Sequence, residues 1–194
     1  MGGKNAQREG ENMQMLRYGF VLLIICFFAS LTLSVTYKIT HSRIEAQAIN
    51  EERDSLAEVF PGATNFKDAV LDSNSYYIAE KDNKEIGYVI RVQTKGYGGL
   101  INMLVGFDIN GEIKGVKILS HSETPGLGAK INEVRAGEKV PWFLKQFEGK
   151  FAKNLELKDT SEGIQAITGA TISSNAVVSG IKKEVTEFIS RLKL

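Results

Sequence analysis

Cysteine, tryptophan, histidine and proline are all scarce in this chain of 194 residues, which contains one, one, two and three of them. A single cysteine, Cys26, excludes an intrachain disulfide and any metal cluster held by several cysteines. The 24 lysines and arginines nearly balance the 23 aspartates and glutamates, so the charge does not indicate nucleic-acid binding. The length fits one modest domain plus an extension.

Charge is missing altogether from Tyr18–Tyr37, a run of 20 residues. A helix of that length spans about 30 Å, the thickness of the hydrocarbon core of a bilayer. Tyrosines at both ends are typical of interfacial anchors. A cleaved signal peptide would have a shorter apolar core and a small-residue cleavage site, and a lipoprotein would have a small residue where Ile25 precedes Cys26. The run therefore predicts a transmembrane helix.

The flanking residues divide the rest of the chain. Residues 1–17 are polar and predict an unstructured tail, which a slight excess of positive charge places in the cytoplasm. Residues 38–60 predict a charged helical connector that ends at Pro61, and residues 61–194 a folded domain. Ser30 and Ser34 form a small face on the membrane helix. That face could let another helix approach closely, or its hydroxyls could bond their own backbone.

The domain begins with strands and ends with helices. Runs rich in Val, Ile and Tyr, separated by the turn pairs Asp82-Asn83 and Asn110-Gly111, predict strands at 75–80, 86–94, 102–108 and 113–120. Residues 130–146 are helical in pieces. Apolar residues recurring at steps of three and four from Val178 to Leu192 predict a final amphipathic helix. Because strands and helices do not alternate, the fold class is α+β, with an antiparallel sheet packed with helices.

The most informative stretch is residues 164–175, which reads IQAITGATISSN. It holds four hydroxyl side chains, those of Thr168, Thr171, Ser173 and Ser174, around the small pair Gly169-Ala170. Ser173, Ser174 or Asn175 can cap the final helix. The turn before a helix N-terminus suits an anion, most often a phosphate. A capped turn without a ligand explains the same pattern, and the order of a Walker A loop is absent.

Two other segments are rich in glycine or turn residues, and the second of them, taken alone, is an ordinary turn. Residues 95–100 read KGYGGL, which either brings the backbone close to a ligand or makes a sharp bend. The segment is not a dinucleotide fingerprint, because Ile101 stands where the last glycine would be. Residues 121–128 read HSETPGLG. Its histidine, His121, has no second metal ligand nearby and is interpreted as a hydrogen-bonded structural histidine.

The segment TGATISS resembles the flavinylation motif of the FMN-binding domain found in the RnfG family of Rnf complexes and in the related flavoproteins of sodium-pumping NADH:quinone reductases. The resemblance implies that Thr171 carries FMN through a phosphoester bond made by a flavin transferase. Where that family usually has an acidic residue, three positions before Thr168, this chain has Gln165.

The order of the motifs, from KGYGG through HSETPGLG and Trp142 to TGAT, resembles that of the RnfG family. The resemblance implies that two loops hold the flavin ring, mostly by backbone contacts. The implied cofactor-binding residues, besides Thr171, are Gly98, Gly99, Leu100, Glu123, Thr124, Gly126, Leu127, Gly128, Thr168, Gly169 and Ala170. No acid–base catalytic residue is implied.

The expected protein is therefore a single-span subunit of an Rnf complex in the cell membrane, relaying electrons between ferredoxin and NAD and coupled to ion translocation. Its partners would be the other Rnf subunits, the flavin transferase and membrane lipid, with the C-terminal domain on the extracytoplasmic side. Two alternatives stay open: a flavin subunit of a quinone reductase, and a membrane-anchored binding module that receives no flavin.

Overall fold

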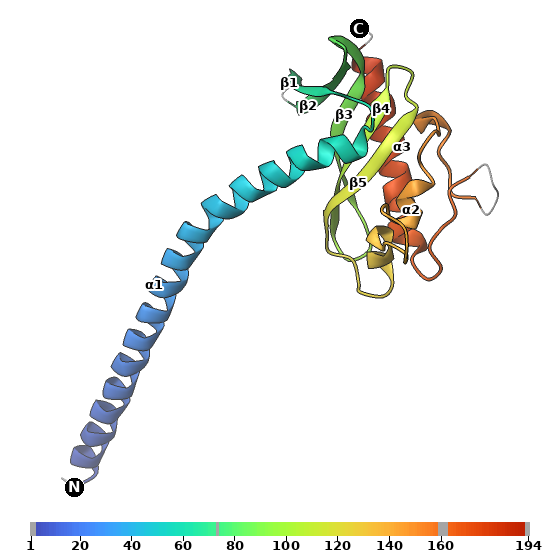
Figure 1. Ribbon diagram of the computed structural model, residues 1–194. Helices are drawn as coiled ribbons and strands as arrows, with labels where there is room; N and C mark the ends of the chain where they lie inside the picture. The colour runs from blue at the N-terminus through green and yellow to red at the C-terminus, as the bar shows by residue number, and fades with distance from the viewer. Residues whose placement is uncertain (1–2, 73, 159–162, 193–194) are drawn as a thin grey trace. The chain divides into compact units, whose positions relative to one another are not determined.

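The computed structural model describes the backbone of residues 3–72, 74–158 and 163–192 (Figure 1). The chain forms two compact units, divided between Asn50 and Glu51. A single helix of 57 residues, α1 (Gly3–Val59), supplies the first unit and enters the second. The unstructured tail expected at residues 1–17 is therefore wrong from Gly3 onward. This segment lacks proline and is rich in Gln, Glu, Met and Arg, which have good helix propensity.

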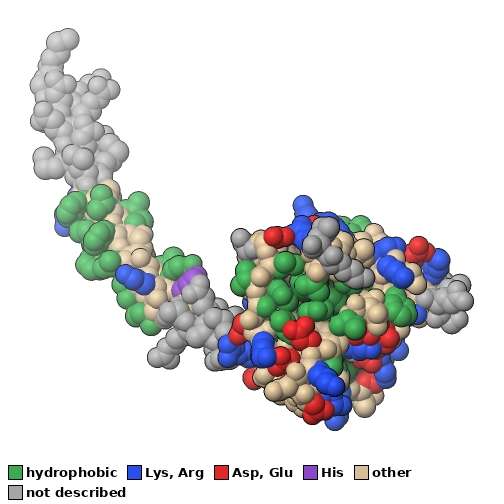
Figure 2. All heavy atoms as spheres, turned by 90° about the horizontal axis from the view of Figure 1, so that it is seen from above, with side chains coloured by type: hydrophobic (Ala, Val, Ile, Leu, Met, Phe, Trp, Pro, Cys, Tyr) green, Lys and Arg blue, Asp and Glu red, His purple; other side chains and the backbone are tan. Residues whose placement is uncertain are grey.

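The part of α1 from Arg17 to His41 is long and apolar enough to cross a membrane. Its described side chains are exposed and mostly hydrophobic (Figure 2). The hydroxyls of Ser30, Thr32 and Thr36 donate to backbone carbonyls four residues earlier, at 2.7 to 2.9 Å. These three hydroxyls therefore bond their own backbone, which satisfies each polar group without a neighbouring helix.

The second unit contains an antiparallel sheet of five strands in sequence order. The strands are β1 (Asn65–Leu71), β2 (Asn74–Lys81), β3 (Lys84–Lys95), β4 (Leu100–Asp108) and β5 (Ile113–His121). Both predicted turn pairs are hairpin turns: Asp82 and Asn83 have φ of 51° and 59°, and Gly111 has φ of 85°. The predicted α+β class is confirmed. The edge strand β1 was not predicted, because apolar and polar residues do not alternate regularly along its sequence, NFKDAVL.

The larger core lies between the sheet and α3 (Thr171–Leu192). Alternate residues of β3 and β4, such as Ile90, Val92 and Met103, face Val177 and Ile181 of α3. Three short helices complete this layer: η1 (Gly128–Asn132), α2 (Trp142–Lys145) and η2 (Ala152–Asn154). The helix α3 begins earlier than expected, so Ser173 and Ser174 lie inside its first turn and do not cap it.

The last turns of α1 pack on the opposite face of the sheet, where Leu56, Val59 and Phe60 contact a second core. Glu52 is buried there and accepts hydrogen bonds from the Tyr77 hydroxyl at 3.0 Å and from Arg91 Nη2 at 2.5 Å. The hydrogen bonds with Glu52 raise the pKa of Arg91. The pKa of Tyr77 is also raised, mainly by burial and in addition by the neighbouring Glu52 carboxylate. The compact unit thus begins at Glu51, inside the segment interpreted as a connector.

Candidate functional site

Three loops meet at one end of the second unit, the lower end in Figure 1. The first is KGYGGL, which closes the hairpin between β3 and β4: Lys95 pairs with Leu100, and the Gly96 N–H donates to the Gly99 carbonyl at 2.8 Å. The second is HSETPGLG, which leaves β5. The third is the turn before α3. We call them the glycine loop (96–99), the ETPGLG loop (123–128) and the TGAT turn (168–171).

The ETPGLG loop is a compact turn held by its own backbone. The Thr124 carbonyl accepts from the N–H groups of Leu127 at 3.2 Å and Ala129 at 3.1 Å, and Gly126 has φ of 77°. The side chains of Thr124 and Leu127 are exposed, whereas Gly128 is buried at the start of η1. The His121 ring accepts the Glu123 N–H at its Nδ1, at 3.3 Å. His121 is thus hydrogen-bonded to the loop that follows it.

Glu123, in the ETPGLG loop, joins the glycine loop to the first turn of α3, which follows the TGAT turn. Its side chain is buried, with one carboxylate oxygen accepting from the Gly98 N–H at 3.1 Å and the other from the Ser173 hydroxyl at 2.5 Å. Ser173 lies 50 positions further along the chain, two residues after Thr171. The carboxylate of Glu123, a residue that the family resemblance implies in cofactor binding, is thus engaged by protein groups.

The loops approach one another where side chains are absent. A Cβ on Gly98 would lie 2.3 Å from the Ser122 carbonyl oxygen, and one on Gly128 would lie 2.3 Å from Glu123 Oε2. Both distances are far inside van der Waals contact; at Gly98 the obstacle is backbone, whereas at Gly128 it is the Glu123 side chain. Packing against Ser122 explains Gly98, and Gly128 leaves room for a carboxylate of its own loop, whether or not a ligand is present.

The four hydroxyls of the TGATISS segment differ in access. Ser173 and Ser174 are buried, while Thr168 and Thr171 are exposed. Ser174 Oγ accepts from the Ile167 N–H and donates to the Ala170 carbonyl, each at 3.0 Å, and so fastens the TGAT turn to the first turn of α3. Gly169 is exposed with φ of 79° and Ala170 is buried. Only the two threonines can meet another molecule without rearrangement.

Each loop also exposes apolar side chains. Tyr97, Leu100, Leu127 and Ile172 are 73%, 50%, 49% and 59% exposed. Exposed apolar groups gathered on neighbouring loops are typical of a surface that binds an apolar ligand or a partner. A flat aromatic ring beside an exposed threonine hydroxyl fits this composition.

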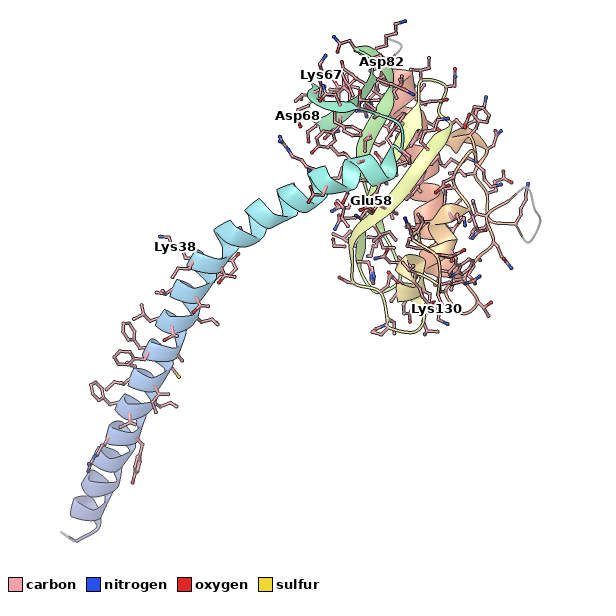
Figure 3. All side chains as sticks on the ribbon, viewed as in Figure 1. Lys38, Glu58, Lys67, Asp68, Asp82 and Lys130 are labelled. Carbon is pink, nitrogen blue, oxygen red and sulfur yellow. The ribbon has the colours of Figure 1, made fainter. Side chains whose placement is uncertain are left out.

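A hollow of about 290 Å³ lies beside the TGAT turn, lined by Lys130, Arg135, Trp142, Gln165 and Thr168 among others. The Arg135 guanidinium stacks on the Trp142 ring at 4.3 Å from its centroid. Lys130 lies at the end of the unit away from Lys67 and Asp82 (Figure 3). The hollow was not predicted from the sequence, because its two cations come from η1 and the loop after it, which have no motif of their own. Its two cations can pair with a phosphate group, although the Glu133 carboxylate lines the same hollow.

Other parts of the described structure offer less. A hollow of about 390 Å³ between β2, β3 and the end of α3 is lined by residues such as Tyr76, Gln93 and Phe188, and it contains none of the predicted site residues. Among the described residues, no cluster of histidine, cysteine and carboxylate side chains could hold a metal ion.

The sequence matches the FMN-binding domain family over residues 96–186 and the RnfG N-terminal region over residues 11–59. The RnfG-type protein of the proton-translocating ferredoxin:NAD(+) oxidoreductase complex of Clostridium ljungdahlii is 35% identical, over 86% of this chain and 87% of the relative. The chain belongs to the RnfG family. Its counterpart in the Na(+)-translocating ferredoxin:NAD(+) oxidoreductase complex of Acetobacterium woodii is 32% identical, over 88% of this chain and 90% of its own length.

Two solved structures share the fold of this RnfG family member. They are NqrC of Shewanella oneidensis and the corresponding protein of the Na(+)-translocating NADH-quinone reductase of Parabacteroides distasonis, each with a TM-score of 0.50. The first is 22% identical and covers 68% of this chain and 72% of its own; the second is 21% identical, with 62% and 63%. The family match at residues 11–59 and the apolar span together make the chain a membrane-anchored protein.

Proposed function

We propose that this protein is the electron-transfer subunit of an ion-translocating ferredoxin:NAD oxidoreductase and carries FMN as a phosphoester on Thr171. Support for the complex comes from the family and from the names of the relatives, one proton-translocating and one Na(+)-translocating. The FMN-binding domain match, from 96 to 186, begins at the glycine loop and includes the ETPGLG loop and the TGAT turn. The other Rnf subunits, a flavin transferase and lipid would be the partners.

The solvent exposure of the hydroxyl side chains is the observation that supports Thr171 as the attachment site. Of four hydroxyls in TGATISS, Thr168 and Thr171 are exposed, whereas Ser173 and Ser174 are buried and hydrogen-bonded. Thr171 is the first residue of α3, where N–H groups without helical partners and the helix dipole favour a phosphate. The resemblance of the motif chooses Thr171 over Thr168.

Bound FMN would supply the redox chemistry, while the chain holds and shields it. A covalent tether on Thr171 prevents the cofactor from leaving during repeated turnover. Lys130 and Arg135 line a hollow with Thr168, three residues before Thr171, and would offset the charge of a phosphoester that reaches it, while Leu100 and Leu127 would cover apolar ring surface. No described residue has to transfer a proton for this role.

The test is intact-mass measurement of the full chain made with and without a flavin transferase. The wild-type protein and Thr168→Ala should gain the mass of one flavin phosphoester only when the enzyme is present, and Thr171→Ala should gain none. Full labelling of Thr171→Ala, or a flavin-bearing peptide modified at Thr168, would reject Thr171. A wild-type protein that is never labelled would favour the alternative of a binding module without flavin.

We further propose that the N-terminus is cytoplasmic and that the domain lies on the extracytoplasmic side. The bias of positive charge around the span is slight, so the family resemblance provides most of the support. Protease added to right-side-out vesicles should remove the domain. Digestion only in inverted vesicles would reverse the orientation.

A further inference from the structure

Glu123 differs from the other buried carboxylates of the described chain in its partners. Glu52 is paired with Arg91 and Glu80 with Lys67, each at 2.5 Å. Glu123 is 6% exposed, and within the described residues no cation lies within salt-bridge distance of it. Its two partners, a backbone N–H and a serine hydroxyl, are neutral. A buried anion held only by neutral donors is costly, so its position calls for an explanation beyond stability.

The carboxylate occupies the space where the loops meet. A Cβ on Gly96 would lie 2.0 Å from Oε1, and a Cβ on Gly128 would lie 2.3 Å from Oε2. Two of the three loops therefore leave room for this side chain by having no side chain of their own. Ser173, two residues after the TGAT turn, places the first turn of α3 against it. The N-terminal end of the helix dipole favours negative charge at this place.

We propose that Glu123 is a positioning residue for the flavin on Thr171: it fixes the glycine loop and the ETPGLG loop to the start of α3, and its charge, which no cation pairs, disfavours electron uptake by the group they hold. The second half rests on the proposed function. Reduction adds electrons, and hence negative charge, to the ring. A fixed anion nearby opposes that gain, which lowers the midpoint potential.

Two variants separate shape from charge. Glu123→Gln keeps the volume and an acceptor for the Gly98 N–H but removes the charge, while Glu123→Ala removes both ties. Glu80→Gln is the matched control, because Glu80 is a buried carboxylate whose partner Lys67 lies at the other end of the unit (Figure 3). All are made in the full chain, in detergent.

The first measurement needs no flavin. Amide hydrogen exchange of Gly98 is followed in protein made without the transferase. Glu123→Ala should speed it by at least about tenfold relative to the wild type, since a hydrogen bond to a charged group is lost. Glu80→Gln should leave the rate unchanged. If Glu123→Ala does not fold, Ser173→Ala, which frees one carboxylate oxygen, should also speed the exchange. Unchanged exchange in the folded variants would overturn the fixing role.

The second measurement uses flavin-loaded protein titrated with dithionite as the electron donor. Glu123→Gln should have a more positive midpoint potential than both the wild type and Glu80→Gln. A potential equal to that of the wild type would overturn the charge effect. The two proposals fail separately: an unlabelled wild-type protein rejects the attachment, while the exchange measurement still tests how Glu123 holds the loops.

Discussion

Two buried glutamates, Glu52 near the end of α1 and Glu123 after β5, are held in different ways. Glu52 meets the guanidinium of Arg91 and the hydroxyl of Tyr77, so a cation offsets its charge. Glu123 meets only a backbone N–H and a serine hydroxyl. The first arrangement anchors a helix to the sheet face. The second joins the glycine loop and the ETPGLG loop to the start of α3, and its charge is left to act on whatever those loops bind.

The largest expected effect on stability comes from removing the cation that pairs with Glu52. Arg91→Ala leaves Glu52 buried without its cation, and we expect a loss of about 3 kcal/mol in the free energy of unfolding. This is the lower end of the range for a broken buried pair, because the Arg91 side chain is 52% exposed. Chemical denaturation followed by Trp142 fluorescence measures it. Trp142 is the only tryptophan, so the signal reports on the domain.

Arg53→Ala is the matched control, because its pair with Asp68, at 3.5 Å, joins side chains 63% and 69% exposed. It should cost less than about 1 kcal/mol. Equal losses in the two variants would show that the Glu52 contact does not anchor α1.

At the loop end, the corresponding change is Gly98→Val. The valine Cβ would lie 2.3 Å from the Ser122 backbone oxygen, so the glycine loop has to move. The move strains the hydrogen bond that the backbone N–H of residue 98 donates to Glu123. We expect a loss of about 2 kcal/mol in stability and an altered flavin absorbance spectrum in loaded protein. Tyr97→Ala, a change to an exposed neighbour, should leave stability nearly unchanged. An unaltered spectrum in Gly98→Val would mean that the glycine loop only closes the hairpin.

How much of this arrangement the sequence could predict depends on distance along the chain. The TGAT turn and the glycine loop are local patterns of small residues that the sequence alone singled out. The ETPGLG loop was singled out through the family resemblance. The bond from Ser173 to Glu123 was not, because it joins residues 50 positions apart and a serine near a helix start is ordinarily interpreted as a cap.

The errors in secondary structure have equally local causes. The helix α3 starts at Thr171, before the first residue of its apolar stripe, because Ser174 fastens the preceding turn to it. Helical periodicity starts only where apolar residues begin and so places the boundary too late. The hollow with Lys130 and Arg135 forms only when η1 and the following loop fold against the TGAT turn, and nothing in either segment alone indicates it.

Ser174→Ala tests the helix start. The buried hydroxyl is the acceptor for the Ile167 N–H, so its loss should cost about 1 to 2 kcal/mol while leaving covalent flavin in place. Ser179→Ala removes an exposed hydroxyl that donates to the Asn175 carbonyl at 2.7 Å and should change stability by less than about 0.5 kcal/mol. Denaturation and intact mass are measured on the same samples. Loss of the flavin in Ser174→Ala would point to a role for Ser174 in attachment.

The smallest effect concerns Glu80 and depends on pH. The hydrogen bond from Lys67 lowers the pKa of Glu80, so its contribution to stability is present above the unfolded pKa, about 4.3, and is lost as pH falls through the lower folded value. Glu80→Gln removes this contribution. The variant should melt below the wild type at pH 7, and the gap should close as the pH falls below about 4. A gap that stays constant from pH 7 to acid would show that the Lys67 contact stabilises no charge. In that case the contrast between paired and unpaired buried carboxylates would rest on Glu52 alone.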